Sequence, residues 1–364
     1  MANLRKKFSL HKRMLFNIHA RYVGVQSKIH KLQYFFWECT SKCNLACKHC
    51  GSDCKIEDNC PNMPADDFLN VCKDVAKNYD ASKVMVVVTG GEPLMRSDLE
   101  YCGNELKKMG FPWGMVSNGF AMTESRFRSL RNAGLKSVTV SLDGLKENHD
   151  WMRGVDGSFE RAVNAIKMLA SEPNMVYDVV TCVNKRNILE LDEVKKLLIE
   201  IGVKQWRLFI IDPIGRAAKN DELMLDNEQF KYVYDFIYKT RSEGSIVASA
   251  GCDGFLGDYE GQVRNGFFFC RAGVNVASVL ANGDIGACPN INRGFVQGNI
   301  YKDNFIDIWN NKFEHYRNRK VFKTGICAKC DLWKWCRGEG MHLREPNAEN
   351  PLQCSFNKIF SQNV

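Results

Sequence analysis

Three cysteines with the spacing CxxxCxxC carry the most specific chemistry in the sequence. Cys43, Cys47 and Cys50 come directly after an apolar run at 34–37. Cysteine thiolates hold 4Fe–4S clusters, and three of them on one short loop leave one iron free to bind a small molecule. A structural zinc ion is the alternative, but a closed zinc site takes about four protein ligands and usually pairs two CxxC knuckles. The spacing therefore favours a cluster with an open iron. Cys54 and Cys60 follow closely, and a role for them stays open.

A second motif, VTGGEPL at 88–94, follows the cysteine loop. With both motifs in this order, the chain resembles the radical S-adenosylmethionine (radical SAM) family. The resemblance implies that the three loop cysteines hold the cluster and that its open iron binds the amino and carboxylate groups of SAM. An electron from the cluster would then break a carbon–sulfur bond and give a 5′-deoxyadenosyl radical. The motif residues expected near the SAM amino group are Gly90, Gly91, Glu92 and Pro93. Glycine suits such a close approach because it has no Cβ.

The elements that must position these motifs alternate between strand and helix patterns. From residue 32 onward, apolar runs typical of buried parallel strands are separated by amphipathic stretches of helical spacing. The predicted strands lie at 34–40, 84–89, 113–116, 137–143, 176–183 and 205–211. Six βα units of roughly 30 residues fall short of the roughly 250 residues of an eightfold barrel. The expected fold is therefore α/β, a partial (β/α)6 TIM-like barrel, which the resemblance also implies.

Polar residues follow the third and fourth predicted strands, at the mouth of the barrel, where such folds carry their chemistry. The resemblance implies that the end of the fourth strand and an Arg shortly after it bind the carboxylate and ribose of SAM. Ser141 and Arg153 occupy these places. Ser117, Asn118 and Asp143 are further candidates for the cofactor site. Ordinary turn chemistry explains these last three residue types nearly as well.

A second cysteine set fills the C-terminal third of the chain. Cys270 is followed by twelve residues, Gly283, four residues and Cys288, and a CxxCxxxxxC pattern comes later. This region resembles the SPASM extension of radical SAM enzymes, a Cys-rich C-terminal domain. The resemblance implies a complete auxiliary 4Fe–4S cluster held by Cys327, Cys330, Cys336 and Cys354. A zinc ribbon is the rival account, because the spacing alone does not exclude zinc.

A second auxiliary cluster is left open by the sequence. The resemblance assigns to it Cys270, Cys288 and an upstream cysteine, for which Cys252 is the candidate. Where the SPASM pattern has a further cysteine, this chain has Gly340. Such a cluster would keep three cysteines and an open iron, take another ligand such as His342, or be absent.

Composition shifts along the chain divide it into regions. The expected order is a basic leader 1–31, a radical SAM barrel 32–217, a bridging helix 218–244 and a SPASM domain 245–364. Asp226 and Gln229 form a capping box that begins the bridging helix, and Gly244 ends it. In the last region, Asn282 and Gly283 predict a β-hairpin with a type I′ turn.

The charge and the cysteine content limit which cellular compartment and which binding partners are expected. The 364 residues include 16 cysteines and carry a formal net charge of +8, and residues 1–31 contain no acidic residue. A basic segment can touch nucleic acid, anionic lipid or an acidic peptide. Without an RNA-binding signature, a solvated tail or a helix closing the barrel bottom is the favoured interpretation, and nucleic acid is not an expected partner. No signal peptide or membrane-spanning run is evident, so we expect a reducing cytoplasm and metal-binding cysteines.

Together these patterns predict an enzyme whose adenosyl radical abstracts a hydrogen atom at the barrel mouth, with the cofactors supplying the difficult chemistry. SPASM relatives mostly modify ribosomally made peptides or proteins, so a peptide or protein substrate is expected, with a flavodoxin- or ferredoxin-type electron donor. A tetrapyrrole of the haem pathway is the alternative substrate. A non-catalytic iron–sulfur protein that binds peptides or senses iron is the remaining alternative, and the intact cysteine and GGEP motifs argue against it.

Overall fold

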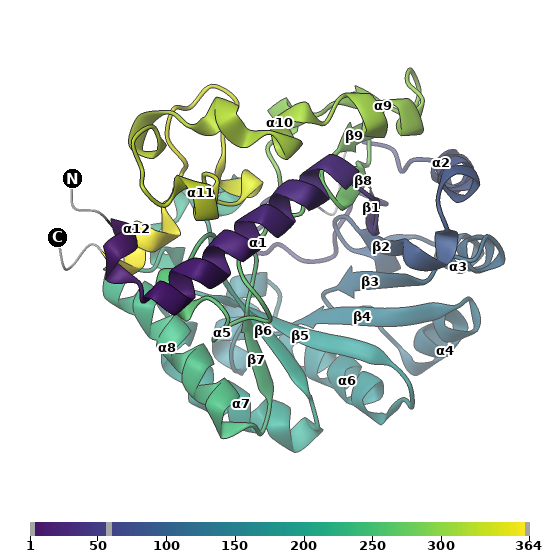
Figure 1. The fold of residues 1–364 in the computed structure, drawn as a ribbon. Coiled ribbons are helices and arrows are strands. Elements are labelled where there is room, and N and C mark those ends of the chain that lie inside the picture. Colours follow the sequence, from purple (N-terminus) through teal and green to yellow (C-terminus); the bar gives the residue numbers. More distant parts are fainter. Residues whose placement is uncertain (1–3, 56–59, 361–364) are drawn as a thin grey trace.

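A single mixed sheet organises the molecule (Figure 1). The computed structural model of the chain describes residues 4–55 and 60–360; the ends of the basic leader and of the C-terminal region, 1–3 and 361–364, lie outside this range. Within it, ten strands follow the order β10-β9-β8-β1-β2-β3-β4-β5-β6-β7. They span β1 Tyr34–Glu38, β2 Met85–Thr89, β3 Trp113–Ser117, β4 Leu135–Ser141, β5 Val176–Val183, β6 Gln205–Ile210, β7 Val247–Ala250, β8 Val276–Val279, β9 Asp284–Gly286 and β10 Gly298–Asn299.

Helices on the outer face of the sheet complete a partial TIM-like barrel, which confirms the predicted fold class (Figure 1). The barrel helices are α2 Ala65–Asn78, α3 Leu99–Lys108, α4 Glu124–Asn132, α5 Lys146–Arg153, α6 Ser158–Ser171, α7 Leu191–Ile201 and α8 Asn227–Glu243. Their apolar faces bury the outward side chains of the strands. Trp37 of β1, for example, stacks on Phe68 of α2 with 4.5 Å between ring centroids. Because β1 to β7 run parallel, their carboxyl ends share one rim.

The six predicted barrel strands are present, and the sheet extends beyond them at both edges. β7 pairs in parallel with β6, although it lies in the stretch assigned to the C-terminal domain. β8 pairs in parallel with β1, so a strand from the cysteine-rich region joins the barrel sheet directly. The sequence did not predict β7 as a strand because it is four residues long and mostly small, with the sequence VASA. Residues after β7 and β8 therefore open onto the same rim as the motif loops.

The structure confirms the predicted ends of α8 but only part of the prediction for the β8–β9 hairpin. The capping box of Asp226 and Gln229 is present at the start of α8, and Gly244 ends it in the left-handed region, as predicted. The predicted β8–β9 hairpin is also present, but the prediction of a type I′ turn within it is wrong. Only Gly283 has a positive φ there, +87°, and Leu280 N donates to Asp284 O across a three-residue loop. A loop of that length needs one left-handed residue after a type I turn, whereas type I′ needs two in succession.

The basic N-terminal segment forms α1 Leu10–Ile29, which begins at Ser9, whose Oγ accepts a hydrogen bond from Lys12 N. α1 packs against α11 Trp333–Cys336 (Figure 1). The other helices of the C-terminal region are α9 Phe305–Asn311, α10 Glu314–Arg317 and α12 Ser355–Phe360. The inner face of α1 buries Phe16 and Val23. Its outer face leaves apolar side chains exposed at Leu10, Met14, Ile18, Tyr22, Val25 and Ile29. None of the helices described here is long and apolar enough to cross a membrane.

Candidate functional site

The cysteine loop leaves the carboxyl end of β1 and folds into a small apolar cluster at the rim. Cys43 and Cys47 are each 8% exposed and pack with Leu45 and Cys54, while Cys50 lies at the edge of the same cluster. Cys43 N donates to Lys55 O at 2.9 Å, which holds the loop against the segment that follows it. The structure thus brings the three predicted ligands of the first cluster together on one short segment.

The GGEP turn crosses the backbone of the cysteine loop in direct contact. Gly91 N donates to Thr40 O at 2.7 Å, and Glu92 N donates to Lys42 O at 2.9 Å. A Cβ added at Gly90 would lie 2.3 Å from Thr40 O, and one at Gly91 would lie 2.1 Å from Lys42 O. The two glycines are therefore required for the close approach of the two motifs.

Glu92 connects the GGEP turn to the end of β3. Its carboxylate is 1% exposed and accepts hydrogen bonds from Ser117 Oγ and from the backbone N of Asn118, both at 2.8 Å. Burial raises the pKa of Glu92, although these donors oppose the shift. Pro93 then begins a short 3₁₀ turn, Pro93–Met95. The Asn118 side chain lies with Nδ2 3.9 Å from Cys43 Sγ, so this group of residues reaches the cysteine loop.

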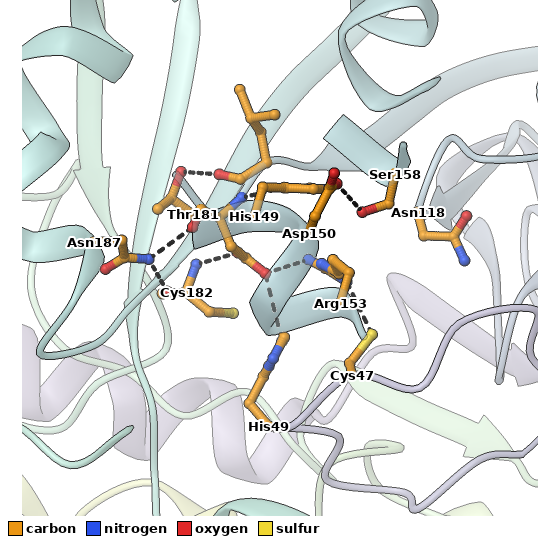
Figure 2. Close-up of polar contacts among 12 residues, drawn as sticks. Cys47, His49, Asn118, His149, Asp150, Arg153, Ser158, Thr181, Cys182 and Asn187 are labelled. Carbon is orange, nitrogen blue, oxygen red and sulfur yellow. Dashed lines mark hydrogen bonds and ion pairs between the residues drawn. The ribbon is translucent and has the colours of Figure 1, made fainter. Parts of the chain in front are cut away.

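Arg153, at the end of α5, lies between Asp143 and the cysteine loop (Figure 2). Its Nη2 is 2.7 Å from Asp143 Oδ2, and its Nη1 is 3.6 Å from Cys47 Sγ. Burial works against ionisation of Asp143, but Arg153 and two nearby histidines hold its pKa below the usual range. Arg153 Nε is buried without a partner among the described residues. Asp143 is thus engaged in holding Arg153, whereas Ser141 lies half-buried at the end of β4.

Further residues at this rim were missed by the sequence analysis. His49 lies between two of the loop cysteines in the sequence, with Nε2 3.9 Å from Asp143 Oδ2 (Figure 2). Arg216, after β6, donates from Nη2 to Cys54 O at 2.7 Å. A hydrogen bond from the Cys54 thiol lowers the pKa of Cys50, and Arg216 contributes to the same shift. The position of His49 inside the CxxC segment was the available signal; nothing in the sequence linked Arg216 to the cysteines.

The residues at this rim fit an anionic iron–sulfur cluster. Side-chain donors lie close to the cysteines: Asn118 near Cys43, and Arg153 near Cys47. Hydrogen bonds and positive charge of this kind stabilise thiolates, the form that binds metal. In the described part of the chain, no three Cys, His, Asp or Glu side chains converge closely enough to hold one metal ion. The side-chain donors beside Cys43 and Cys47 are the observation that supports a cluster at this rim.

The second cysteine set surrounds α11 beside an aromatic cluster. Cys330, Cys336 and Cys354 pack at the edge of a core that contains Phe16, Phe255, Phe356 and Trp335. Arg344 is fully buried, and its Nη2 donates to Cys327 Sγ at 3.3 Å. Cys327 and Cys330 lie on one short turn, in which Cys330 N donates to Cys327 O at 3.2 Å. The cysteines expected to hold the complete auxiliary cluster therefore lie in one region, in which Cys327 is buried and the other three are partly buried.

The remaining cysteines of the C-terminal pattern also lie near one another. Cys252 comes directly after β7, Cys270 precedes β8 and Cys288 follows β9. Burial raises the pKa of Cys288 to about 12, and the neighbouring thiols of Cys252 and Cys270 add to that shift. Cys270 Sγ accepts a hydrogen bond from Met341 N at 3.5 Å. Gly340, adjacent to Met341, contributes no side chain to this group.

Comparison with known proteins agrees with these sites. The family model of the radical SAM superfamily matches residues 37–198, and that of an iron–sulfur cluster-binding domain, SPASM, matches residues 270–331. The mycofactocin maturase MftC of Mycolicibacterium smegmatis is 30% identical, covering 83% of this chain and 76% of that protein. The AdoMet-dependent heme synthase of Nitratidesulfovibrio vulgaris is 26% identical, covering 88% of this chain and 91% of that protein.

Solved structures share the fold. Streptococcus suis SuiB bound to S-adenosylmethionine has a TM-score of 0.69 at 18% identity, covering 91% of this chain and 79% of that one. The anSMEcpe structure with bound AdoMet and a Cp18Cys peptide has a TM-score of 0.68 at 21% identity, covering 91% and 96%. The two family models match in the order in which the cysteine loop, the GGEP turn and the second cysteine set occur along the chain. The chain belongs to the radical SAM superfamily and is an enzyme of that family with a C-terminal SPASM domain.

Proposed function

We propose that this enzyme oxidatively modifies a ribosomally made peptide or protein. The supporting observation is a groove of about 510 Å³ between the end of β6, the start of α8 and the C-terminal segment around Cys354. Ile211 and Met224 line the groove and also belong to the apolar cluster of Met152, which directly precedes Arg153. The groove therefore lies beside Cys354 and is bordered by side chains that pack around Met152, the neighbour of Arg153 in the chain.

The lining of the groove suits a polypeptide. Its charged side chain is Lys358, whose Nζ is already hydrogen-bonded to Leu225 O at 3.2 Å. The other side chains that line it are apolar, amide or thiol groups. A tetrapyrrole that carries several carboxylates needs Arg or Lys partners to replace the water around them. A peptide needs only apolar contact and hydrogen bonds to its backbone, which this lining supplies.

A reaction of the haem pathway is the second candidate. The observation that favours it is the similarity to the AdoMet-dependent heme synthase, which extends over 88% of this chain. The similarity to mycofactocin maturase, at higher identity over 83%, favours the peptide substrate. The chemistry of the groove supports the peptide over the tetrapyrrole.

The residues of the rim take definite roles under this proposal. Cys43, Cys47 and Cys50 would hold a 4Fe–4S cluster that, with SAM bound, supplies a carbon-centred radical. Arg153 would bind SAM through its unpartnered Nε and keep positive charge beside the cysteine loop. Glu92 fixes the GGEP turn against β3, so that the backbone of the turn is rigid where SAM would bind. Apolar side chains around the site exclude water from the radical step.

The experiment compares two classes of substrate in separate reactions under anaerobic conditions. The reconstituted enzyme receives SAM, a reductant and either an iron coproporphyrin or the small peptides encoded beside its gene. We expect mass spectrometry to show that one peptide has lost hydrogen while 5′-deoxyadenosine accumulates. Cys43→Ala should abolish the peptide modification and the formation of 5′-deoxyadenosine. Conversion of the porphyrin with every peptide unchanged would contradict the proposal.

A matched pair of variants tests the groove itself. Ile326 lines it and is 52% exposed, whereas Val321 is 53% exposed and lies outside it. Ile326→Arg is expected to raise the KM for the peptide about tenfold, the effect of about 1.4 kcal/mol of lost binding. Val321→Arg is expected to leave the KM unchanged, and neither variant should alter SAM cleavage without peptide. Equal KM values in both variants would exclude this groove as the peptide site.

A further inference from the structure

A histidine of the C-terminal region occupies the space that a side chain at position 340 would take. A Cβ built on Gly340 would lie 2.4 Å from His342 Cε1 and 2.7 Å from His342 Nδ1. A side chain at 340 and the imidazole in its present position are therefore mutually exclusive. Gly340 is the position at which the SPASM cysteine pattern is broken, so the ring replaces the missing thiol in space.

The imidazole lies beside the cysteines whose ligand set is incomplete. Met341, between Gly340 and His342, donates from its N to Cys270 Sγ at 3.5 Å. Cys270 and Cys288 both pack against the main core of the molecule. Cys252 lies two residues after β7, whose carboxyl end shares the barrel rim with that of β8. Three thiols and one imidazole, from four separate segments, thus lie at this rim.

An acidic residue from the barrel holds the ring. His342 Nε2 lies 3.2 Å from Asp212 Oδ2, and both side chains are largely buried. Asp212 follows β6, so the contact joins the C-terminal region to the barrel rim. A neutral imidazole that donates its Nε2 proton to Asp212 would carry its lone pair on Nδ1, which is nearer to position 340 than Nε2 is. Histidines that bind metals commonly donate their other N–H to a carboxylate in this way.

We propose that His342 Nδ1 is the fourth protein ligand of an auxiliary iron–sulfur cluster held by Cys252, Cys270 and Cys288, and that Asp212 orients the imidazole. Imidazole replaces thiolate on iron in Rieske centres, so the ligand type has a chemical precedent. With four protein ligands the cluster has no open iron, and it serves electron transfer instead of substrate binding. The inference is independent of which substrate the enzyme modifies.

The test measures the iron content and the ligands of the cluster, and it does not depend on the enzyme's reaction with a substrate. In the full-length variant with Cys43, Cys47 and Cys50 replaced by Ala, the remaining 4Fe–4S sites give about eight irons per chain if two auxiliary clusters are present and about four if one is. We expect about eight irons. In the reduced protein, pulsed electron paramagnetic resonance should detect coupling to a nitrogen that changes on ¹⁵N-histidine labelling.

Variants in the same background assign the nitrogen. His342→Ala should remove the coupling, whereas His315→Ala, at an exposed histidine of α10, should keep it. The double variant Gly340→Cys with His342→Ala should retain about eight irons, since it restores a fourth thiolate, and show no histidine coupling. Asp212→Asn should keep the coupling but shift the midpoint potential of one cluster.

Any of three results would overturn the proposal: about four irons in the starting variant, about eight irons without histidine coupling, or a histidine coupling that persists in His342→Ala. None depends on finding the peptide substrate, so a failed search for the substrate leaves this test intact.

Discussion

Arg153 and Asp143 form a buried ion pair on which the position of the cysteine loop depends. Arg153 is 6% exposed and Asp143 is not exposed at all. The arginine also contacts Cys47, so the pair connects the ends of β4 and α5 to the cysteine loop. Removing one member of a buried pair costs about 3–5 kcal/mol because the other charge stays behind without compensation.

Arg153→Gln is therefore expected to lower the free energy of unfolding of the cluster-free protein by about 3 kcal/mol or more. The double variant Arg153→Gln with Asp143→Asn should recover part of this loss, because no buried charge is left unpaired. Denaturant unfolding measures both. Arg128→Gln is the control, since Arg128 pairs with Glu124 on the exposed surface of α4, where a pair contributes under about 1 kcal/mol. A similar loss in the exposed and buried variants would contradict the assignment.

Among individual residues, the sequence predicted those that belong to contiguous motifs. The cysteine loop and the GGEP turn carry their spacing in a few consecutive residues, so their chemistry was readable before their contacts were known. The contact between Asp212 and His342 could not be predicted from the sequence. The two residues are distant in the chain and meet only where the C-terminal region packs on the barrel rim. The role of Asp143 was also open, since an Asp after a strand is equally typical of a turn.

Among the elements, the GGEP turn crosses the cysteine loop at a distance that leaves no room for a side chain. Hydrogen bonds from Gly91 N and Glu92 N fix the turn against the loop backbone. At Gly91 a Cβ would meet backbone atoms that cannot rotate away. The six barrel strands that carry these loops were predictable from short apolar runs separated by stretches of helical spacing. β7 was not, because its small residues become a strand only through pairing with β6.

Gly91→Ala is expected to separate the two motifs. The added methyl group overlaps Lys42 O, and relief of such overlap costs at least about 1–3 kcal/mol. The variant should unfold at lower denaturant concentration, and after reconstitution it should lack the irons of the cysteine loop while keeping those of the C-terminal region. Gly24→Ala is the control, since Gly24 lies in α1 with no atom within 4 Å of its added Cβ. Full iron content in Gly91→Ala would refute the packing argument.

In the whole molecule, α1 joins the first residues of the chain to the cysteine-rich region at its end. Phe16 packs against Phe255 and Trp335, with ring centroids 5.2 Å and 5.0 Å apart. Those rings belong to the cluster that borders Cys330, Cys336 and Cys354. The basic segment is thus one wall of an auxiliary site. Its outer face, which includes Ile18, takes no part in that wall.

Phe16→Ala should therefore expose the auxiliary cysteines to solvent. Truncating a buried Phe costs about 3–5 kcal/mol and leaves a cavity, and the cavity here would open beside the cysteines. We expect the visible absorbance of the reconstituted variant lacking Cys43, Cys47 and Cys50 to bleach severalfold faster in air once Phe16 is replaced. Ile18→Ala removes a similar apolar group from the same helix, but its side chain is 55% exposed, so it should bleach at the parent rate. Equal bleaching in both variants would show that α1 does not shield the cluster.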